Sequence, residues 1–261
     1  MGIILYENLD IGEIPPTPAT PHLAYETSLS LNKSSNLFLE HVKKFGHPIG
    51  YIQEQSGAIL QNIVPVHKTE YQQISTSSKV ELALHTETAF HPYKPDYVML
   101  LCLRGDPNAV TTYANLADIL KHISPVGKQM LKEKVFTTGI DLSFRTNGEK
   151  DREIPISILK EVDGTLTFTY DVTVIKGSTP QAQELLNELQ DIIEACTQEV
   201  VLKTGDLLVI DNRKTIHGRK PFQARYDGTD RWVQRILVRK KLPPENQRIG
   251  NIIITSFDNG E

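Results

Sequence analysis

The sequence has little of several features that define large protein classes. Its two cysteines, Cys102 and Cys196, are too few to form a disulfide scaffold. Both lie among apolar residues, so we expect buried free thiols and a reducing compartment. The longest purely apolar run, residues 97–103, is far shorter than the ~20 residues of a membrane-spanning helix. These absences exclude a disulfide-stapled domain and argue against a spanning helix.

A strong excess of charge of one sign is also missing. The chain has 28 Lys and Arg against 32 Asp and Glu, a formal net charge of −4 and a pI near 6.1. Nothing is basic enough for a nucleic-acid or acidic-lipid surface, and the first residues lack the basic start of a signal peptide. We therefore predict a cytoplasmic protein that acts on a small molecule, without a nucleic-acid or membrane partner. The sequence leaves the oligomeric state open.

The composition is that of an ordinary globular protein. With 39% hydrophobic and 23% charged residues, the chain is not a mainly disordered one. Its length favours one large domain over two small ones. No repeat, charge block or Gly/Ser linker marks a boundary, so we predict a single domain over residues 1–261. Residues 14–21 are rich in proline, which fixes φ and removes donors, so we expect residues 1–33 to form an extended N-terminal arm.

The hydrophobic pattern predicts more strands than helices. Helices are expected at residues 35–45, 115–123, 124–131 and 179–196. Short β-branched segments predict strands at residues 59–66, 97–103, 141–144, 165–170, 200–201, 207–210, 232–238 and 252–255. Many short strands with few long helices indicate a mainly β sandwich or barrel with flanking helices. Strands and helices do not alternate and no glycine-rich phosphate loop is present, which excludes a doubly wound sheet.

A histidine and a glutamate form the first candidate site. On a strand, residues i and i+2 point to the same face, so His85 and Glu87 would project side by side and could bind one metal ion. A His-x-Glu triplet often arises by chance. The alternative is a surface His/Glu pair on a strand edge. We prefer this alternative unless further residues of the sequence also indicate a metal site.

His217 supplies a candidate third ligand. It follows the apolar strand at 207–210 and a polar turn, which places it on a neighbouring strand. Two histidines and one carboxylate form the facial triad of non-haem Fe(II) oxygenases. This triad leaves open positions for a bidentate co-substrate and O₂.

Two arginines near the C-terminus strengthen this interpretation. Arg231 and Arg235 are four residues apart and share a face of one strand. Two guanidinium groups on the inward face of an apolar strand are costly unless anions meet them. Arginine suits carboxylates because its planar fork binds them with two hydrogen bonds. The alternative is an exposed strand face paired with surface acids.

These motifs carry a family resemblance. Residues 85–104, which begin His85-Thr86-Glu87, resemble the clavaminate synthase-like group of Fe(II)/2-oxoglutarate oxygenases, a branch related to TauD. They are most similar to the hydroxylases of free arginine and asparagine. Residues 46–51, residues 57–65 and the region from His217 to Arg231 agree in kind, so the similarity spans roughly residues 45–240. Most 2-oxoglutarate oxygenases use His-x-Asp, whereas His-x-Glu marks this smaller group. The resemblance implies a double-stranded β-helix, or jelly-roll, core.

The resemblance also implies roles at the iron and at the co-substrate. The implied Fe(II) ligands are His85, Glu87 and His217. Arg231 would bind the distal carboxylate of 2-oxoglutarate, assisted by Thr111, with Thr112 as a near alternative.

Further residues are implied at the substrate. Arg235 would hold the α-carboxylate of an amino acid, and Glu87 could also meet its ammonium group. Gln53, Gln55 and Ser75 lie where the family binds the amino-acid head group.

One more position bears on the substrate's side chain. Asp171 matches a family position that contacts the far end of the substrate. Arginine-specific relatives carry acids at two alternating positions there, and this chain has Thr169 and Asp171. One acid suits a lysine-type ammonium, an amide or another polar group better than a guanidinium. The alternative for Asp171 is a simple turn acid.

The implied activity is hydroxylation of an unactivated C–H bond of a free polar or basic L-amino acid, of the arginine, lysine or asparagine type. It would use Fe(II) and O₂, convert 2-oxoglutarate to succinate and belong to specialised metabolism. One alternative is the same oxygenase chemistry, as hydroxylation, desaturation or cyclisation, on a carrier-bound, peptidyl or modified amino acid. Another is a non-catalytic jelly-roll protein that binds a metal or ligand.

Overall fold

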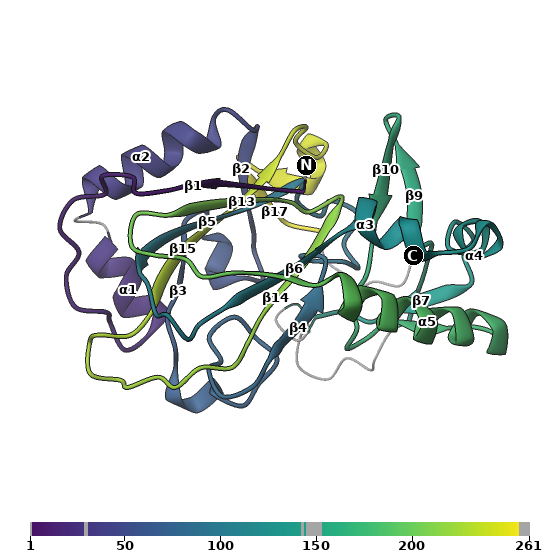
Figure 1. The fold of residues 1–261 in the computed structure, drawn as a ribbon. Helices are drawn as coiled ribbons and strands as arrows, with labels where there is room; N and C mark the ends of the chain where they lie inside the picture. The colour runs from purple at the N-terminus through teal and green to yellow at the C-terminus, as the bar shows by residue number, and fades with distance from the viewer. Residues whose placement is uncertain (1, 29–30, 142–143, 145–152, 256–261) are drawn as a thin grey trace.

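The computed structural model describes residues 2–28, 31–141, 144 and 153–255. Its largest element is an eight-stranded, mostly antiparallel sheet, here called the major sheet (Figure 1). In spatial order the strands are β1 (Ile3–Tyr6), β13 (Leu207–Asp211), β5 (Tyr97–Arg104), β15 (Trp232–Arg239), β2 (His47–Tyr51), β17 (Ile252–Ile253) and β16 (Arg248–Ile249), with β3 (Gln61–Ile63) also paired to β15.

A second, four-stranded sheet is here called the minor sheet. Its order is β12 (Gln198–Val200), β6 (Thr111–Asn115), β14 (Thr215–Arg219) and β4 (Leu82–His85). Smaller sheets join β11 (Lys176–Gly177), β7 (Phe136–Thr138) and β8 (Ile154–Ile156), and pair β9 (Leu159–Val162) with β10 (Thr165–Phe168). The prediction of a mainly β fold is confirmed.

Five α-helices flank the sheets in the described ranges: α1 (Pro21–Ser28), α2 (Asn32–Val42), α3 (Leu116–His122), α4 (Pro125–Met130) and α5 (Pro180–Cys196). Short 3₁₀ turns occur at η1 (Gln55–Gly57), η2 (His67–Thr69) and η4 (Glu245–Gln247). Figure 1 shows α2 and α5 on opposite sides of the molecule. No helix in these ranges is long and apolar enough to cross a membrane.

Strand β5 shows why the longest apolar run has no polar alternation. Its even-numbered residues, Val98, Leu100 and Cys102, pack in the cluster on the inner face. Its odd-numbered residues, Met99, Leu101 and Leu103, pack with Phe38 and Val42 of α2 on the outer face. A strand buried on both faces needs apolar residues at every position, and each fully buried aliphatic side chain contributes about 1.5–3 kcal/mol.

The minor sheet is covered on its outer face by α3 and α5. Ala114 of β6 and Ile216 of β14 pack there against Leu186 and Leu189 of α5. Because side chains alternate along a strand, the neighbours of Ala114 and Ile216 on the same strands point to the opposite face of the minor sheet. That face holds the site described below.

The predicted helix boundaries match α3, α4 and α5 within one residue. Helix α2 begins at Asn32 and ends at Val42, about three residues before each predicted boundary. The predicted strand 59–66 shortens to β3. The predicted strand 141–144 includes residues 142–143, which lie outside the described residues.

The prediction of an extended arm over residues 1–33 is wrong for β1, for α1 and for the start of α2 at Asn32. Ile3–Tyr6 forms β1, which pairs with β13 in the major sheet. Pro21 begins α1, because a proline at the first helical position lacks only an N–H group that has no helical partner there. The stretch between them is held by Arg104, which donates hydrogen bonds to the Pro15 carbonyl (2.7 Å) and the Thr17 hydroxyl (3.1 Å).

Candidate metal centre and active site

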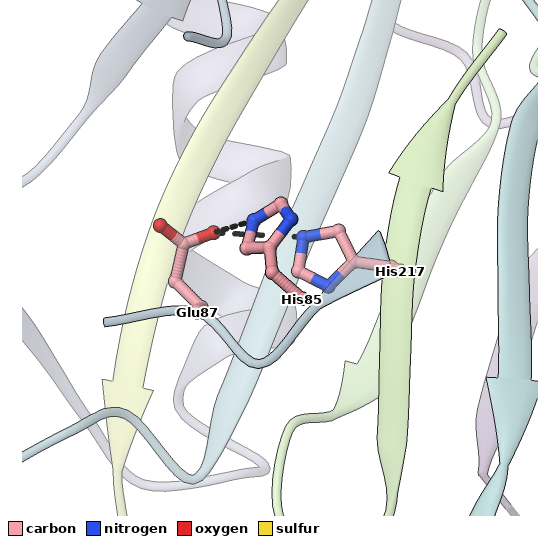
Figure 2. A group of neighbouring side chains, drawn as sticks. All are labelled: His85, Glu87 and His217. Atoms are coloured by element: carbon pink, nitrogen blue, oxygen red, sulfur yellow. Dashed lines mark ion pairs between the residues drawn. The ribbon is translucent and has the colours of Figure 1, made fainter. Parts of the chain in front are cut away.

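Two strands of the minor sheet bring the histidines together. His85 ends β4, and His217 lies directly opposite it on β14. Their rings are 4.6 Å apart between centroids. Residues opposite each other on paired strands point to the same face, so both imidazoles face the interior between the two sheets (Figure 2).

Glu87 reaches the same point from a turn. The prediction that it lies on a strand with His85 is wrong, because β4 ends at His85. The buried Asn212 side chain holds this turn: its Oδ1 accepts from the Glu87 amide (2.8 Å), and its Nδ2 donates to the Glu87 carbonyl (3.1 Å). Thr88 then has a positive φ of 54°. The local motif named residues that lie close together, but a contact distant in sequence sets the geometry of Glu87.

The three side chains are close enough to share one ion. Glu87 Oε2 lies 3.9 Å from His85 Nε2 and 3.5 Å from His217 Nε2 (Figure 2). One ligand atom from each residue lies within 4.8 Å of the others. His85 Nδ1 lies 2.8 Å from the Ala83 carbonyl, so this nitrogen carries the proton and Nε2 presents its lone pair. Two imidazoles and one carboxylate form a donor set that fits Fe(II).

The charges around the triad favour metal-binding protonation states. Burial alone would raise the pKa of the Glu87 carboxyl, but Arg235 and the two histidines outweigh it and hold this pKa well below its usual range. Burial lowers the pKa of His217, and Glu87 only partly offsets this effect. A metal ligand must be an ionised carboxylate or a neutral imidazole, and the site provides both.

The two predicted arginines lie in different surroundings on and beside β15. Arg235 donates to Glu87 Oε1 (2.8 Å), to Glu54 Oε2 (3.3 Å) and to Gln61 Oε1 (2.7 Å from Nε). Arg231 is 8% exposed, and its guanidinium forms no hydrogen bond within the described part of the chain. Burial lowers its pKa. Among the described residues, the charge of Asp106 offsets this burial only in part, and no carboxylate accepts a hydrogen bond from the Arg231 guanidinium.

A cavity of about 410 Å³ joins these groups, a volume typical of a small-molecule site. Of the predicted residues, those that line it are His85, Glu87, His217, Arg231, Arg235, Thr111, Asp171 and Ser75. The cavity therefore brings the triad, both arginines and three of the weaker candidates together. Their roles as ligand-binding residues remain predictions.

Other predicted residues lie elsewhere. Gln55 does not line the cavity; its amide lies 3.5 Å from the Asn62 carbonyl. Gln53 donates to the Thr255 carbonyl. Gln55 and Ser56 both have positive φ, and this tight turn redirects the side chains, so that Glu54 lines the cavity instead.

Strand geometry separates Thr111 from Thr112. Thr111 lines the cavity, whereas its neighbour Thr112 does not, because adjacent residues on β6 point to opposite faces. A similar distinction holds between Thr169 and Asp171. The hydroxyl of Thr169 accepts a hydrogen bond from Lys94 and lies off the cavity wall, so Asp171 is the residue of this pair that faces the cavity.

Sequence reasoning missed Glu54 and Arg219, which both line the cavity. Arg219 lies two residues beyond His217 on β14, so the i, i+2 rule could have found it. Glu54 carried no such periodic signal, because it lies in the turn between β2 and η1.

Comparison with known proteins agrees with this geometry. The model of the taurine catabolism dioxygenase TauD, TfdA family matches residues 34–237. The chain belongs to this family. The L-lysine 3-hydroxylase of Catenulispora acidiphila is 35% identical over 245 residues, which cover 91% of this chain and 67% of that protein. The L-asparagine oxygenase of Streptomyces coelicolor is 35% identical over 242 residues, which cover 91% of this chain and 71% of that protein.

Solved structures of TauD-family relatives match the whole fold. An asparagine oxygenase in complex with Fe(II), 2S,3S-3-hydroxyasparagine and succinate has a TM-score of 0.83 and 31% identity, covering 98% of this chain and 80% of its own. The oxygenase OrfP in complex with Fe and alpha-ketoglutaric acid has a TM-score of 0.86 and 29% identity, covering 97% of this chain and 81% of its own. The predictions of a jelly-roll core and of an Fe(II)/2-oxoglutarate-dependent dioxygenase are confirmed.

Proposed function

We propose that this TauD-family enzyme hydroxylates an unactivated C–H bond of a free polar or basic L-amino acid, with Fe(II), 2-oxoglutarate and O₂. The observation that carries the proposal is the charged group beside the metal triad. Arg235 lies between the carboxylates of Glu54 and Glu87, all on the wall of one cavity. One guanidinium and two carboxylates complement the α-carboxylate and the α-ammonium group of an amino acid.

His85, Glu87 and His217 would hold the iron. Bound iron supplies the oxidation of the C–H bond, coupled to conversion of 2-oxoglutarate to succinate. Three protein ligands leave room at the ion for a bidentate co-substrate and O₂. The hydrogen bond from His85 to the Ala83 carbonyl orients the His85 ring, and the positive charge of Arg235 keeps the Glu87 carboxylate ionised.

Arg231 would bind the distal carboxylate of 2-oxoglutarate. Its guanidinium faces the cavity without a hydrogen-bond partner among the described residues, and a carboxylate would satisfy it with two parallel hydrogen bonds. The Thr111 hydroxyl, on the same cavity wall, would add a further donor.

Arg235 would bind the α-carboxylate of the amino acid. Its contact to Glu54, at 3.3 Å, is longer than its contacts to Glu87 and Gln61, so an incoming carboxylate displaces it at least cost. Glu54 and Glu87 then face the ammonium group. A carrier-bound amino acid has no free carboxylate, and for this reason the geometry favours a free amino acid over a carrier-bound one.

Asp171 would contact the far end of the substrate. Its Oδ1 accepts hydrogen bonds from the amide and the hydroxyl of Thr173, at 2.9 and 2.6 Å. Its Oδ2 makes no hydrogen bond within the described ranges and is free for a ligand. A single available carboxylate oxygen suits an ammonium or an amide better than a guanidinium, which two carboxylates hold best.

A paired substrate screen tests the proposal. Fe(II) enzyme reconstituted without air would receive 2-oxoglutarate, then air and single L-amino acids, each beside its carboxamide. We expect a +16 mass product and succinate from one polar or cationic amino acid, and at least tenfold less from its carboxamide, because Arg235 loses its anion. Equal turnover of acid and carboxamide would overturn the assignment of a free α-carboxylate.

A further inference from the structure

Arg219 is a buried arginine on the cavity wall to which the proposed function gives no role. It lies on β14 two residues beyond His217, directly opposite Thr111 of β6. It is 4% exposed. We propose that Arg219 is a positioning residue that clamps the cavity-lining segment 70–80 to the strand that carries His217.

The side chain of Arg219 contacts this segment and Phe222, which lies in the loop after β14. Nη1 donates to the Ser77 carbonyl (2.5 Å), and Nη2 donates to the Ser77 hydroxyl (3.0 Å) and to the Val80 carbonyl (3.4 Å). The guanidinium carbon lies 4.9 Å from the centre of the Phe222 ring. Both terminal nitrogens are therefore used within the protein. This separates Arg219 from Arg231, whose guanidinium remains available for an anion.

The clamped segment forms a wall of the cavity. Gln73, Ile74 and Ser75 line it, and the segment runs from η2 to β4 through turns and bends, without a helix or strand of its own. Local backbone hydrogen bonds, such as those from the Lys79 amide to the Glu70 carbonyl (2.8 Å) and from the Ser77 amide to the Ile74 carbonyl (3.0 Å), hold it in place of a regular ladder. Side-chain contacts therefore add to its stability. Arg219 provides the contact from the cavity side.

The loop after β14 also holds the segment. The Phe222 amide donates to the Ser78 carbonyl (2.8 Å), and the Tyr226 hydroxyl lies 3.2 Å from Glu70 Oε2. This loop continues to Arg231. The cavity wall that holds Ser75 and the loop that leads to Arg231, directly before β15, are therefore connected through these contacts and through Arg219.

Arginine is needed here for its shape. A planar fork reaches two carbonyls and a hydroxyl at once, whereas the single ammonium group of lysine cannot span them. Loss of the clamp should loosen the amino-acid side of the cavity and leave the metal triad in place, because the triad is held by Asn212 and by the pairing of β4 with β14.

Hydrogen exchange of the iron-loaded enzyme tests the clamp directly. Arg219→Lys and Arg219→Gln should each speed amide exchange within residues 70–80 about tenfold, which corresponds to about 1.4 kcal/mol of lost protection. Arg225→Gln is the matched control, because the Arg225 side chain is 49% exposed and its contacts within the described ranges are to Thr229 and Asp106. Exchange unchanged in both Arg219 variants, or raised equally along the whole chain, would overturn the proposal.

Steady-state kinetics of the Arg219 variants form a second test. This test rests on the proposed function, because it needs an amino acid that the enzyme turns over. The amino acids to be tried are L-lysine, L-ornithine, L-arginine and L-asparagine. For both Arg219 variants we expect KM for the amino acid to rise about tenfold, with a smaller rise in KM for 2-oxoglutarate because Arg219 is also paired with Thr111, and less hydroxylated product per succinate. A rise in KM for 2-oxoglutarate alone would contradict the inference. If no probe is turned over, the proposed function fails while the exchange experiment still decides on the clamp.

Discussion

Arg231 and Arg235 show how surroundings separate two identical side chains on one face. For Arg235, burial is outweighed by the charges of Glu87 and Glu54, and its pKa is raised. For Arg231, burial dominates and the pKa is lowered. Carboxylates already hold the Arg235 guanidinium in position, so a substrate carboxylate can replace one of them. The Arg231 guanidinium has no hydrogen-bonded anion among the described residues and can bind the carboxylate of a co-substrate.

Arg231→Lys should weaken the co-substrate site. Loss of a buried, hydrogen-bonded charge pair costs about 2–5 kcal/mol, so we expect KM for 2-oxoglutarate to rise about a hundredfold. Lysine keeps the charge but not the fork. Titration of 2-oxoglutarate against the Fe(II) enzyme without air measures the same loss as binding. Unchanged affinity would mean that the distal carboxylate lies elsewhere.

Asn212 holds the turn of Glu87, the proposed carboxylate ligand. It is fully buried, and its side chain makes three hydrogen bonds, to the amide and carbonyl of Glu87 and to the Pro95 carbonyl. Asn212→Ala should lower the free energy of unfolding by about 2–3 kcal/mol, since buried backbone groups lose their partners. It should also weaken iron binding at least tenfold, as loss of a supporting contact does at metal sites.

Urea unfolding and iron titration check this prediction. Asn187→Ala is the control, because Asn187 lies on the exposed face of α5 and its side chain accepts a hydrogen bond from Gln183 on the same helix. A variant at Asn212 that binds iron as tightly as the unmodified enzyme would show that the Glu87 turn is held by other contacts.

At the scale of elements, the sequence predicted those with a one-sided or continuous apolar pattern. Helix α5 begins at Pro180 behind the Thr179 cap and ends at Cys196, as its apolar stripe indicated. Strands β5, β13 and β15 were found because both of their faces are buried. These elements form the core and obey the period rules that local sequence reveals.

Two strands on the cavity wall, β6 and β14, were absent from the strands that the hydrophobic pattern predicted, although the sequence placed His217 on a strand. Strand β6 reads Thr-Thr-Tyr-Ala-Asn and β14 reads Thr-Ile-His-Gly-Arg. Their cavity face holds polar groups for ligands, so the apolar alternation that marks a half-buried strand is absent. Tertiary packing of Ala114 and Ile216 against α3 and α5 holds these strands instead.

At the scale of the whole molecule, the two sheets supply different parts of the chemistry. The minor sheet carries the histidines on β4 and β14, and the major sheet carries Arg235 on β15, with Arg231 directly before it. The sequence could name these residues through motif and resemblance. It could not predict that Glu54 lines the cavity and that Gln55 does not, because the turn there depends on backbone conformation rather than on periodicity.

The stability of the whole chain should depend on pH through His91. This residue is 2% exposed, and its Nδ1 accepts a hydrogen bond from the Tyr93 amide at 2.9 Å. Burial, together with the charge of Arg239, lowers its pKa to about 3. The unfolded chain takes up this proton near pH 6.5 and the folded chain does not, so stability falls as pH drops from about 6.5 toward 3.

His91→Asn removes the titrating group and keeps an acceptor for the Tyr93 amide. Unfolding by urea at pH 7.5 and pH 5 should show a smaller loss in the variant than in the unmodified protein. The expected difference is about 2 kcal/mol, from about 1.4 kcal/mol per pH unit below 6.5. Equal losses in the two proteins would show that His91 is not buried in its neutral form.

The stoichiometry of one reaction tests the central claim most directly. Succinate and the +16 amino-acid product would be measured together by mass spectrometry, for the Fe(II) enzyme and for His85→Ala. The account predicts about one succinate per hydroxylated amino acid in the unmodified enzyme and loss of both products to background in the variant, because two ligands cannot complete the triad. Amino-acid-stimulated succinate formation that persists in His85→Ala would contradict the claim that His85, Glu87 and His217 hold the catalytic iron.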